Sequence, residues 1–117
     1  MIATTIEQSQ HLLELGLDPN TADCMWLVTS RARLHVLDGE PISNYDRWEN
    51  YPAWSLSALL EVMPEFYPEL HLYRDGDWYC RCDQVESEYC DDPIIAVYDV
   101  VCWLLDHNAI KNIYKHE

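Results

Sequence analysis

Four side chains in the second half of the chain are of the kinds that bind soft metal ions: His71, Cys80, Cys82 and Cys90. Zn²⁺ takes four such nitrogen and sulfur ligands in a tetrahedron. Positions 75 and 76 are Asp-Gly, which predicts a two-residue hairpin turn with His71 opposite Cys80. The spacing disfavours a shared ion, because Cys-x-Cys on one strand separates its two thiols by about 6–7 Å. We therefore expect no metal and no cofactor, and a cross-strand His–Cys pair with partly buried thiols instead.

The same pair could support a second chemistry, which is nucleophilic catalysis by a thiolate. His71 would act as the base for Cys80, and Glu69 could orient the imidazole ring. Nothing in the sequence resembles a strand-to-helix elbow or a cysteine at a helix N-terminus, which are settings that activate a thiol. A thiol-dependent hydrolase is therefore an alternative and not the leading prediction.

Two pairs of carboxylates have positions that suit structural roles. Asp75 and Asp77 flank the predicted turn, and Asp91 and Asp92 precede the last predicted helix. Aspartate forms turns and caps helices at such positions. Glycosidases need two acids in separate environments beside a sugar cleft. We therefore expect these carboxylates to be structural and expect no catalytic residues. A carboxylate-dependent hydrolase is the second form of the enzyme alternative.

Four aromatic residues recur at every third position of one segment: Tyr45, Trp48, Tyr51 and Trp54. Acidic residues lie between them, and Tyr and Trp dominate the hot spots of protein interfaces. These four are therefore candidate contacts for a protein partner of unknown identity. The alternative is that they pack onto the core beneath an irregular segment, as large aromatic side chains of small domains commonly do.

The chain carries 21 Asp and Glu residues against 7 Lys and Arg, a formal net charge of −14 over 117 residues. A field of this sign repels phosphate groups and anionic lipids, so we expect no direct binding to nucleic acid or to a membrane. The acidic surface could imitate the phosphates of DNA and occupy a basic host protein, or it could serve solubility alone. Repulsion between copies favours a monomer or a weak homodimer.

Length and composition indicate one folded domain spanning residues 1–117. Apolar residues make up 49% of the chain, which is too many for a disordered acidic tail. No run reaches the ~18 uncharged apolar residues of a membrane-spanning helix, and no basic region followed by an apolar stretch marks a signal peptide. The five cysteines are an odd number, so we expect reduced thiols and a cytoplasmic location.

The pattern of apolar and turn-forming residues predicts an α+β fold. Helices are expected over residues 4–15, 55–63 and 93–107, strand character within 22–37, and a hairpin over 70–83. Residues 40–53 are expected to be irregular, because proline and asparagine recur in them. The tail from about residue 111 is expected to fray. These elements predict about three helices packed on a small antiparallel sheet that includes the 70–83 hairpin.

Three segments are similar to one known group of proteins. They are PAWSLSALLEVMP at residues 52–64, LGLDPNTAD at 15–23 and VCWLL at 101–105. On these residues the chain resembles a family of short proteins from gut Bacteroides genomes and from their phages and conjugative elements. No activity is established for that family, so the resemblance implies no site residues. It implies a bacterial cytoplasm and a phage or mobile-element context.

The missing catalytic motif and the family resemblance lead to one functional expectation. We expect a non-enzymatic, acidic accessory or interaction protein of a phage or mobile element, with a protein as its partner. One alternative is a DNA-mimic inhibitor of a host nuclease or DNA-binding protein, whose binding would weaken steeply with salt. The other is a thiol- or carboxylate-dependent hydrolase, which would need a deep pocket with convergent polar groups.

Overall fold

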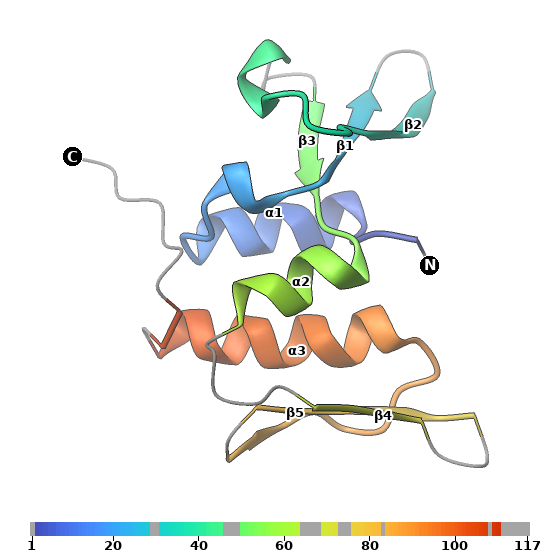
Figure 1. The fold of residues 1–117 in the computed structure, drawn as a ribbon, viewed down its shortest axis with the longest axis vertical. Coiled ribbons are helices and arrows are strands. Elements are labelled where there is room, and N and C mark those ends of the chain that lie inside the picture. Colours follow the sequence, from blue (N-terminus) through green and yellow to red (C-terminus); the bar gives the residue numbers. More distant parts are fainter. Residues whose placement is uncertain are drawn as a thin grey trace.

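The fold has three layers (Figure 1). A computed structural model describes residues 2–28, 31–45, 50–63, 69–72, 76–82, 84–107 and 109–110. Within these residues, three α-helices form a central layer, and a three-stranded antiparallel sheet lies on either side of it. The predicted α+β class is confirmed, with two small sheets in place of the single sheet expected. None of the described helices is long and apolar enough to cross a membrane.

The N-terminal helix, α1 (Ile6–Glu14), begins and ends at residues that suit these roles. The hydroxyl of Thr5 accepts a hydrogen bond from the backbone amide of Gln8, and the side-chain oxygen of Gln8 accepts one from the backbone amide of Thr5. At the other end Gly16 adopts a φ of +98°, and the amides of Gly16 and Leu17 donate to carbonyls of the last turn. Leu17 is fully buried, which fixes the chain as it leaves the helix. The predicted N-terminal helix is therefore confirmed.

The first sheet consists of β1 (Cys24–Val28), β2 (Ala32–Val36) and β3 (Asn50–Ala53), in the order β2-β1-β3. The first two strands confirm the strand character predicted within residues 22–37. The expectation of irregular structure is wrong for β3, which pairs with β1. Pro52 lacks an amide hydrogen and so favoured a loop, but β3 is an edge strand, where a missing donor is tolerated.

Helices α2 (Leu56–Val62) and α3 (Pro93–Asp106) form the centre of the core. The hydroxyl of Ser55 caps α2, and the carboxylate of Asp92 caps α3. Both helices lie where the sequence predicts them. The helix α3 contributes the larger apolar face, and its buried residues are Ile94, Ala96, Val97, Val100, Val101, Leu104 and Leu105.

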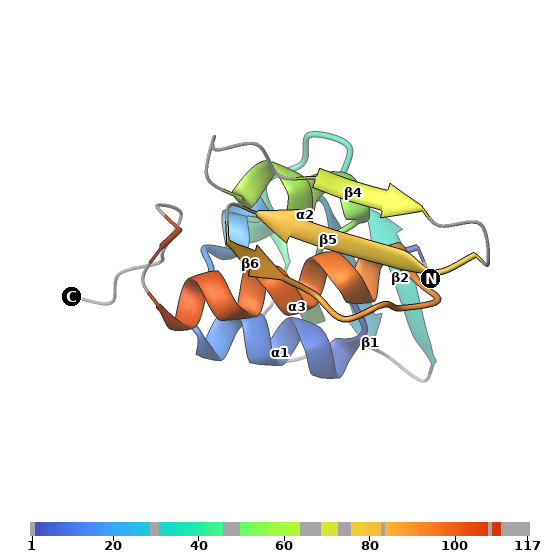
Figure 2. The ribbon, with the colours of Figure 1, turned by 90° about the horizontal axis from the view of Figure 1, so that it is seen from below.

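The second sheet consists of β4 (Glu69–Leu72), β5 (Trp78–Cys82) and β6 (Val85–Glu86), in that order. One side of this sheet packs on α3, and Figure 2 shows the other side turned away from the helices. Cys80 and Cys82 point toward the helices and are buried in the main core. The predicted hairpin therefore forms, with one side covered by α3.

The register of this hairpin differs by one residue from the prediction. A two-residue turn predicts His71 opposite Cys80, whereas the structure pairs His71 with Tyr79 and Leu70 with Cys80. Five residues lie between the two strands in place of the two expected. A change from an even to an odd loop length shifts the pairing by one residue and moves a side chain to the other side of the sheet. The predicted His71–Cys80 pair is therefore wrong.

The N-terminal segment is joined to the rest of the fold through Thr4 and Trp54, both fully buried. The amide of Thr4 donates to the carbonyl of Trp54 over 2.9 Å, and the amide of Trp54 donates to the hydroxyl of Thr4 over 3.0 Å. The carbonyl of Thr4 accepts the indole N–H of Trp26 on β1 at 2.8 Å. The Thr4 hydroxyl also lies 2.8 Å from that of Ser9 on α1. One threonine thereby connects α1, β1 and the chain between β3 and α2.

Replacing Thr4 with valine is expected to lower the free energy of unfolding by about 1–3 kcal/mol, because the amide of Trp54 and the hydroxyl of Ser9 lose a buried partner. The Thr4→Ser variant keeps the hydroxyl and is expected to lose less. Urea unfolding followed by tryptophan fluorescence measures both variants. A Thr4→Val protein as stable as the unchanged chain would contradict the role assigned to this hydroxyl.

Candidate functional site

Figure 2 shows the side of the second sheet that is turned away from the helices. A hollow of about 760 Å³ lies on this side. Its lining comes from β4, β5, β6 and the segment that follows β6. Aromatic side chains form a row across it, and charged side chains border the row. We call this surface the outer sheet face, and its residues are Glu69, His71, Tyr79, Arg81, Glu86, Glu88 and Tyr89.

Strand pairing brings most of the outer sheet face together. His71 on β4 lies opposite Tyr79 on β5, and Arg81 on β5 lies opposite Glu86 on β6. Residues that face each other across an antiparallel pair share one side of the sheet. Because Tyr79 and Arg81 are two positions apart on one strand, all four side chains project from the same side.

The segment after β6 adds Tyr89 to the aromatic row. This segment is held against β5 by Cys90, whose amide donates to the carbonyl of Trp78 over 2.8 Å. The ring of Tyr89 stacks on that of Tyr79 with 5.7 Å between centres and 27° between planes. The ring of His71 lies 5.8 Å from that of Tyr79 on its other side. Tyr89 is 62% exposed, so the row ends in an accessible aromatic ring.

Three carboxylates and one guanidinium give the outer sheet face an excess of two negative charges. The Oε2 atom of Glu69 lies 3.2 Å from Nε2 of His71. The Nε atom of Arg81 lies 3.9 Å from Oε1 of Glu86, and both side chains are half exposed, which makes this pair a weak surface contact. Carboxylates beside aromatic rings attract cations by charge and by the negative potential of the ring faces.

The residues proposed for metal binding or nucleophilic catalysis are not all brought together. His71 lies on the outer sheet face, beside Glu69, whereas Cys80 and Cys82 lie on the opposite side and are buried. Cys90 is half-buried at the edge of the same sheet. Among the residues that the structure describes, no three His, Cys, Asp or Glu side chains are grouped so that they could hold a metal ion.

Burial raises the pKa of three cysteine thiols, Cys24, Cys80 and Cys102. Burial, followed by the neighbouring Cys82, raises the pKa of Cys80 to about 12. Burial raises the pKa of Cys24 and that of Cys102 to about 11. Because the thiolate is the nucleophilic form, none of these three thiols is activated at neutral pH.

Cys80 is expected to react with iodoacetamide at pH 8 at least about 100-fold more slowly in the native protein than in urea, because its raised pKa leaves very little thiolate. Timed alkylation followed by mass spectrometry of tryptic peptides separates Cys80 from Cys82, since Arg81 lies between them. The His71→Ala variant should leave the rate unchanged. Fast native alkylation that depends on His71 would favour the hydrolase alternative instead.

The paired carboxylates occupy the ends of elements. The Oδ1 atom of Asp92 accepts the amide of Ile94 over 2.9 Å, which makes Asp92 the cap of α3. Asp91 is exposed just before it. Asp77 directly precedes β5, and Asp75 lies outside the described residues. The helix-capping interpretation is therefore confirmed for Asp92.

The aromatic partner-binding candidates lie in different settings. Trp54 is fully buried, and its indole N–H donates to the hydroxyl of Thr21 over 2.9 Å, as expected for core packing. Tyr51 is half-buried on β3 and lines a second hollow of about 330 Å³. Tyr45 lies just after a short 3₁₀ turn, and Trp48 is outside the described residues.

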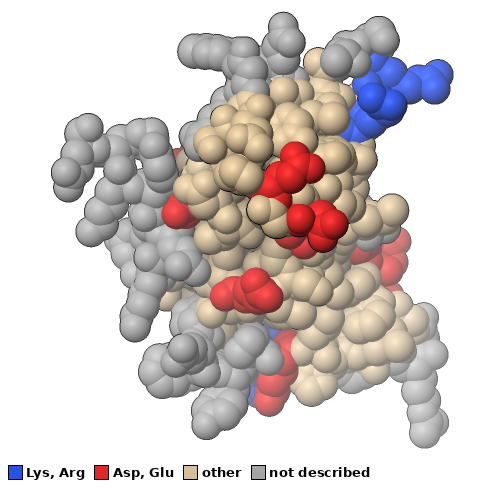
Figure 3. Space-filling model, turned by 45° about the horizontal axis from the view of Figure 1, so that its top comes forward, with Lys and Arg blue, Asp and Glu red and all other residues tan. Residues whose placement is uncertain are grey.

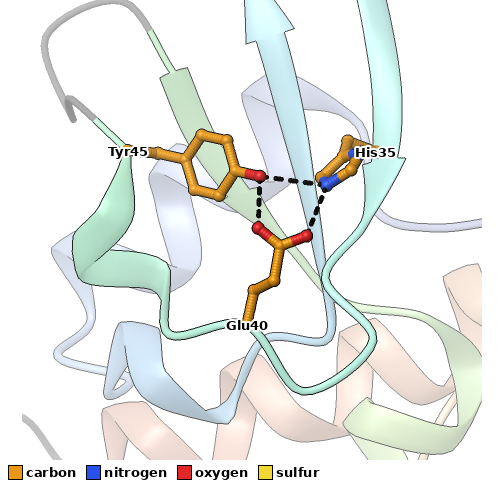
Figure 4. A network of polar contacts seen from close by, with 3 residues as sticks. All are labelled: His35, Glu40 and Tyr45. Atoms are coloured by element: carbon orange, nitrogen blue, oxygen red, sulfur yellow. Dashed lines mark hydrogen bonds and ion pairs between the residues drawn. The ribbon is translucent and has the colours of Figure 1, made fainter.

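Tyr45 belongs to a polar network with His35 on β2 and Glu40 (Figure 4). Its hydroxyl donates to Oε2 of Glu40 over 2.7 Å and lies 3.0 Å from Nε2 of His35, which is 3.4 Å from Oε1 of Glu40. The hydrogen bonds from Tyr45 and then from His35 lower the pKa of Glu40, and the bond to Glu40 raises the pKa of Tyr45. A phenol held protonated in this way serves as a hydrogen-bond donor and not as a nucleophile.

The Tyr45→Phe variant is expected to raise the pKa of the Glu40 carboxyl toward its usual 4.5, because the strongest hydrogen bond to the charged form is lost. A lowered folded-state pKa stabilises the fold above the unfolded-state pKa, and this contribution is lost as the pH falls through the folded-state value. In the Tyr45→Phe variant, the free energy of unfolding should therefore fall less steeply as the pH is lowered through the acid range.

NMR titration of the glutamate side-chain carboxyl carbons measures this pKa. Tyr51→Phe serves as the matched control, because Tyr51 is half-buried on β3 and has no part in the network. Identical Glu40 titrations in the unchanged chain and in Tyr45→Phe would contradict the network.

Sequence reasoning did not identify Tyr79 and Tyr89 as site residues. The sequence contains one signal for this grouping, which is spacing. Glu69 and His71 are two positions apart, as are Tyr79 and Arg81, and residues two apart on a strand share one side of the sheet. That signal groups the four only if the hairpin has the observed register. The position of Tyr89 depends on a segment whose pairing no local pattern indicates.

Comparisons of the chain with models of protein families, with curated proteins and with solved structures found no match. The resemblance to a phage and mobile-element family therefore stays a prediction. The class of site rests on its own geometry, which is an exposed aromatic row on a sheet, bordered mainly by carboxylates.

Proposed function

We propose that this chain is a non-enzymatic, acidic interaction protein that binds a basic protein partner through the outer sheet face. The observation that carries the proposal is the stacked aromatic row, which is open to solvent at Tyr89 and bordered by three carboxylates. An exposed tyrosine that is stacked on a tyrosine of a strand provides contact area at low entropic cost, and Tyr is enriched where binding energy is concentrated.

The charge of the chain supports a basic partner. The formal net charge is −14, and part of this excess of negative charge lies on the outer sheet face. Complementary potentials steer association and exclude partners of the same sign. The same field opposes a nucleic acid as the direct ligand and opposes pairing between copies of the chain.

The enzyme alternative is less well supported by the described residues. His71 and Cys80 project from opposite sides of the sheet, and the buried thiols have raised pKa values. The aspartate that could have joined an acid pair, Asp92, is engaged as a helix cap. A binding role needs none of these groups to react.

The DNA-mimic alternative requires carboxylates arranged in rows like phosphates. On the face drawn in Figure 3, the acidic side chains of the described residues lie in separate groups among uncharged described residues. Separate groups on this face do not form the continuous rows that an extended imitation of DNA requires. The phage or mobile-element context and a cytoplasmic location complete the proposal and rest on the sequence.

A test uses a synthetic peptide of alternating Lys-Gly and Arg-Gly units with a fluorescent label. Anisotropy is expected to show binding that weakens as salt is raised from 50 to 300 mM. The Glu86→Gln/Glu88→Gln variant should bind about three- to tenfold more weakly, because two exposed charge contacts are removed.

The matched control is Glu7→Gln/Glu61→Gln, which makes the same change in net charge at exposed positions on α1 and α2. This control should bind within about twofold of the unchanged chain, since long-range fields are screened beyond a Debye length of ~8–10 Å. Equal losses in both double variants would show that only total charge matters, and the outer sheet face would lose its role.

A further inference from the structure

We infer that the outer sheet face is a site for the guanidinium group of an arginine side chain, carried by the partner protein. This inference rests on the proposed function and names the group that the same site recognises. Three features of the face support a guanidinium: the aromatic row, the carboxylates beside it and the chain's own arginine.

The aromatic row provides a flat, braced surface. Tyr89 is stacked against Tyr79 at 27°, and Tyr79 is in turn flanked by His71 at 5.8 Å. Each ring therefore limits the movement of its neighbour, and Tyr89, the outermost residue of the row, remains 62% exposed. A planar cation can stack on such a ring and gains both from the ring's negative face and from contact area.

The carboxylates provide acceptors next to that surface. Glu86 and Glu88 are two positions apart and both line the hollow. The backbone near Glu88 is fixed, because its carbonyl accepts the hydroxyl of Ser87 over 2.9 Å and the thiol of Cys90 over 3.3 Å. A guanidinium has five N–H donors in one plane, so it can stack on a ring and bond to carboxylates at the ring's edge at the same time.

The chain's own Arg81 already places one guanidinium beside Glu86 on this face. Its Nε atom lies 3.9 Å from Glu86, which leaves that carboxylate with further lone pairs for a second donor. Among the described residues of the face, three carboxylates exceed one arginine, so a partner's cation adds to the existing arrangement without reversing its charge balance. Charge complementarity thus selects a cation, and the flat ring selects the planar one.

A lysine ammonium would satisfy only part of this site. It is a compact, strongly hydrated charge, and it has no planar surface that could stack on the face of a ring. Lysine and arginine peptides of equal charge therefore separate the inference from the proposed function. A neutral peptide controls for contacts that do not involve charge.

The experiment titrates the full chain against three labelled peptides of equal length, (Arg-Gly)₅, (Lys-Gly)₅ and (Ser-Gly)₅. The arginine peptide is expected to bind about three- to fivefold more tightly than the lysine peptide, the range of a cation–ring contact at an exposed site. The serine peptide should not bind. Tyr89→Ala should remove the preference for arginine while both cationic peptides still bind.

Trp103→Ala is the matched control, because Trp103 is another exposed aromatic residue, 46% accessible, on α3. This variant should keep the preference for arginine. Equal binding of the arginine and lysine peptides would overturn the guanidinium site and leave the proposed function standing. No binding of either cationic peptide would overturn both. A preference that survives in Tyr89→Ala would place arginine recognition elsewhere and overturn the inference as well.

Discussion

The buried hydrogen bonds between Thr4 and Trp54 are the contacts on which the arrangement of the layers depends. Trp54 stands between β3 and α2, and Thr4 stands just before α1. The Thr4 amide donates to the Trp54 carbonyl and the Trp54 amide donates to the Thr4 hydroxyl, and these two bonds join the first sheet to the helices. A second connection joins the residue before β1 to the cap of α2. The carboxylate of Asp23 accepts hydrogen bonds from the backbone amide and the hydroxyl of Ser55. Buried polar groups of this kind fix one arrangement, because any other would leave donors without acceptors.

The central helices impose the second constraint, which acts on the hairpin of the other sheet. The apolar surface of α3 must be covered, and β5 covers it with Cys80 and Cys82. Once these two residues face inward, strand alternation directs Tyr79 and Arg81 outward. The candidate site and the core are therefore two sides of one strand. The chemistry differs accordingly, with buried thiols inside and carboxylates beside aromatic rings outside.

The local parts of the fold could be predicted because their signals lie within a few residues. Thr5 with Gln8, Gly16 with Leu17, and Asp92 with Pro93 mark helix ends through hydrogen bonds and backbone angles that neighbours supply. The strand β3 was not predicted, because the partner that makes Pro52 acceptable is distant in sequence. The candidate site was missed for a related reason, since one residue of register decides which side chains His71 accompanies.

The sequence by itself determined the α+β class, the positions of the three helices and the strongly acidic character of the chain, because composition, periodicity and caps are local properties. Only the tertiary structure decided that Trp54 is buried, that His71 and Cys80 lie on opposite sides of a sheet, and that Tyr89 stacks on Tyr79. These outcomes depend on loop length and on pairing between distant segments. Burial of the helical layer selects among the possible pairings, and no short stretch of sequence contains that information.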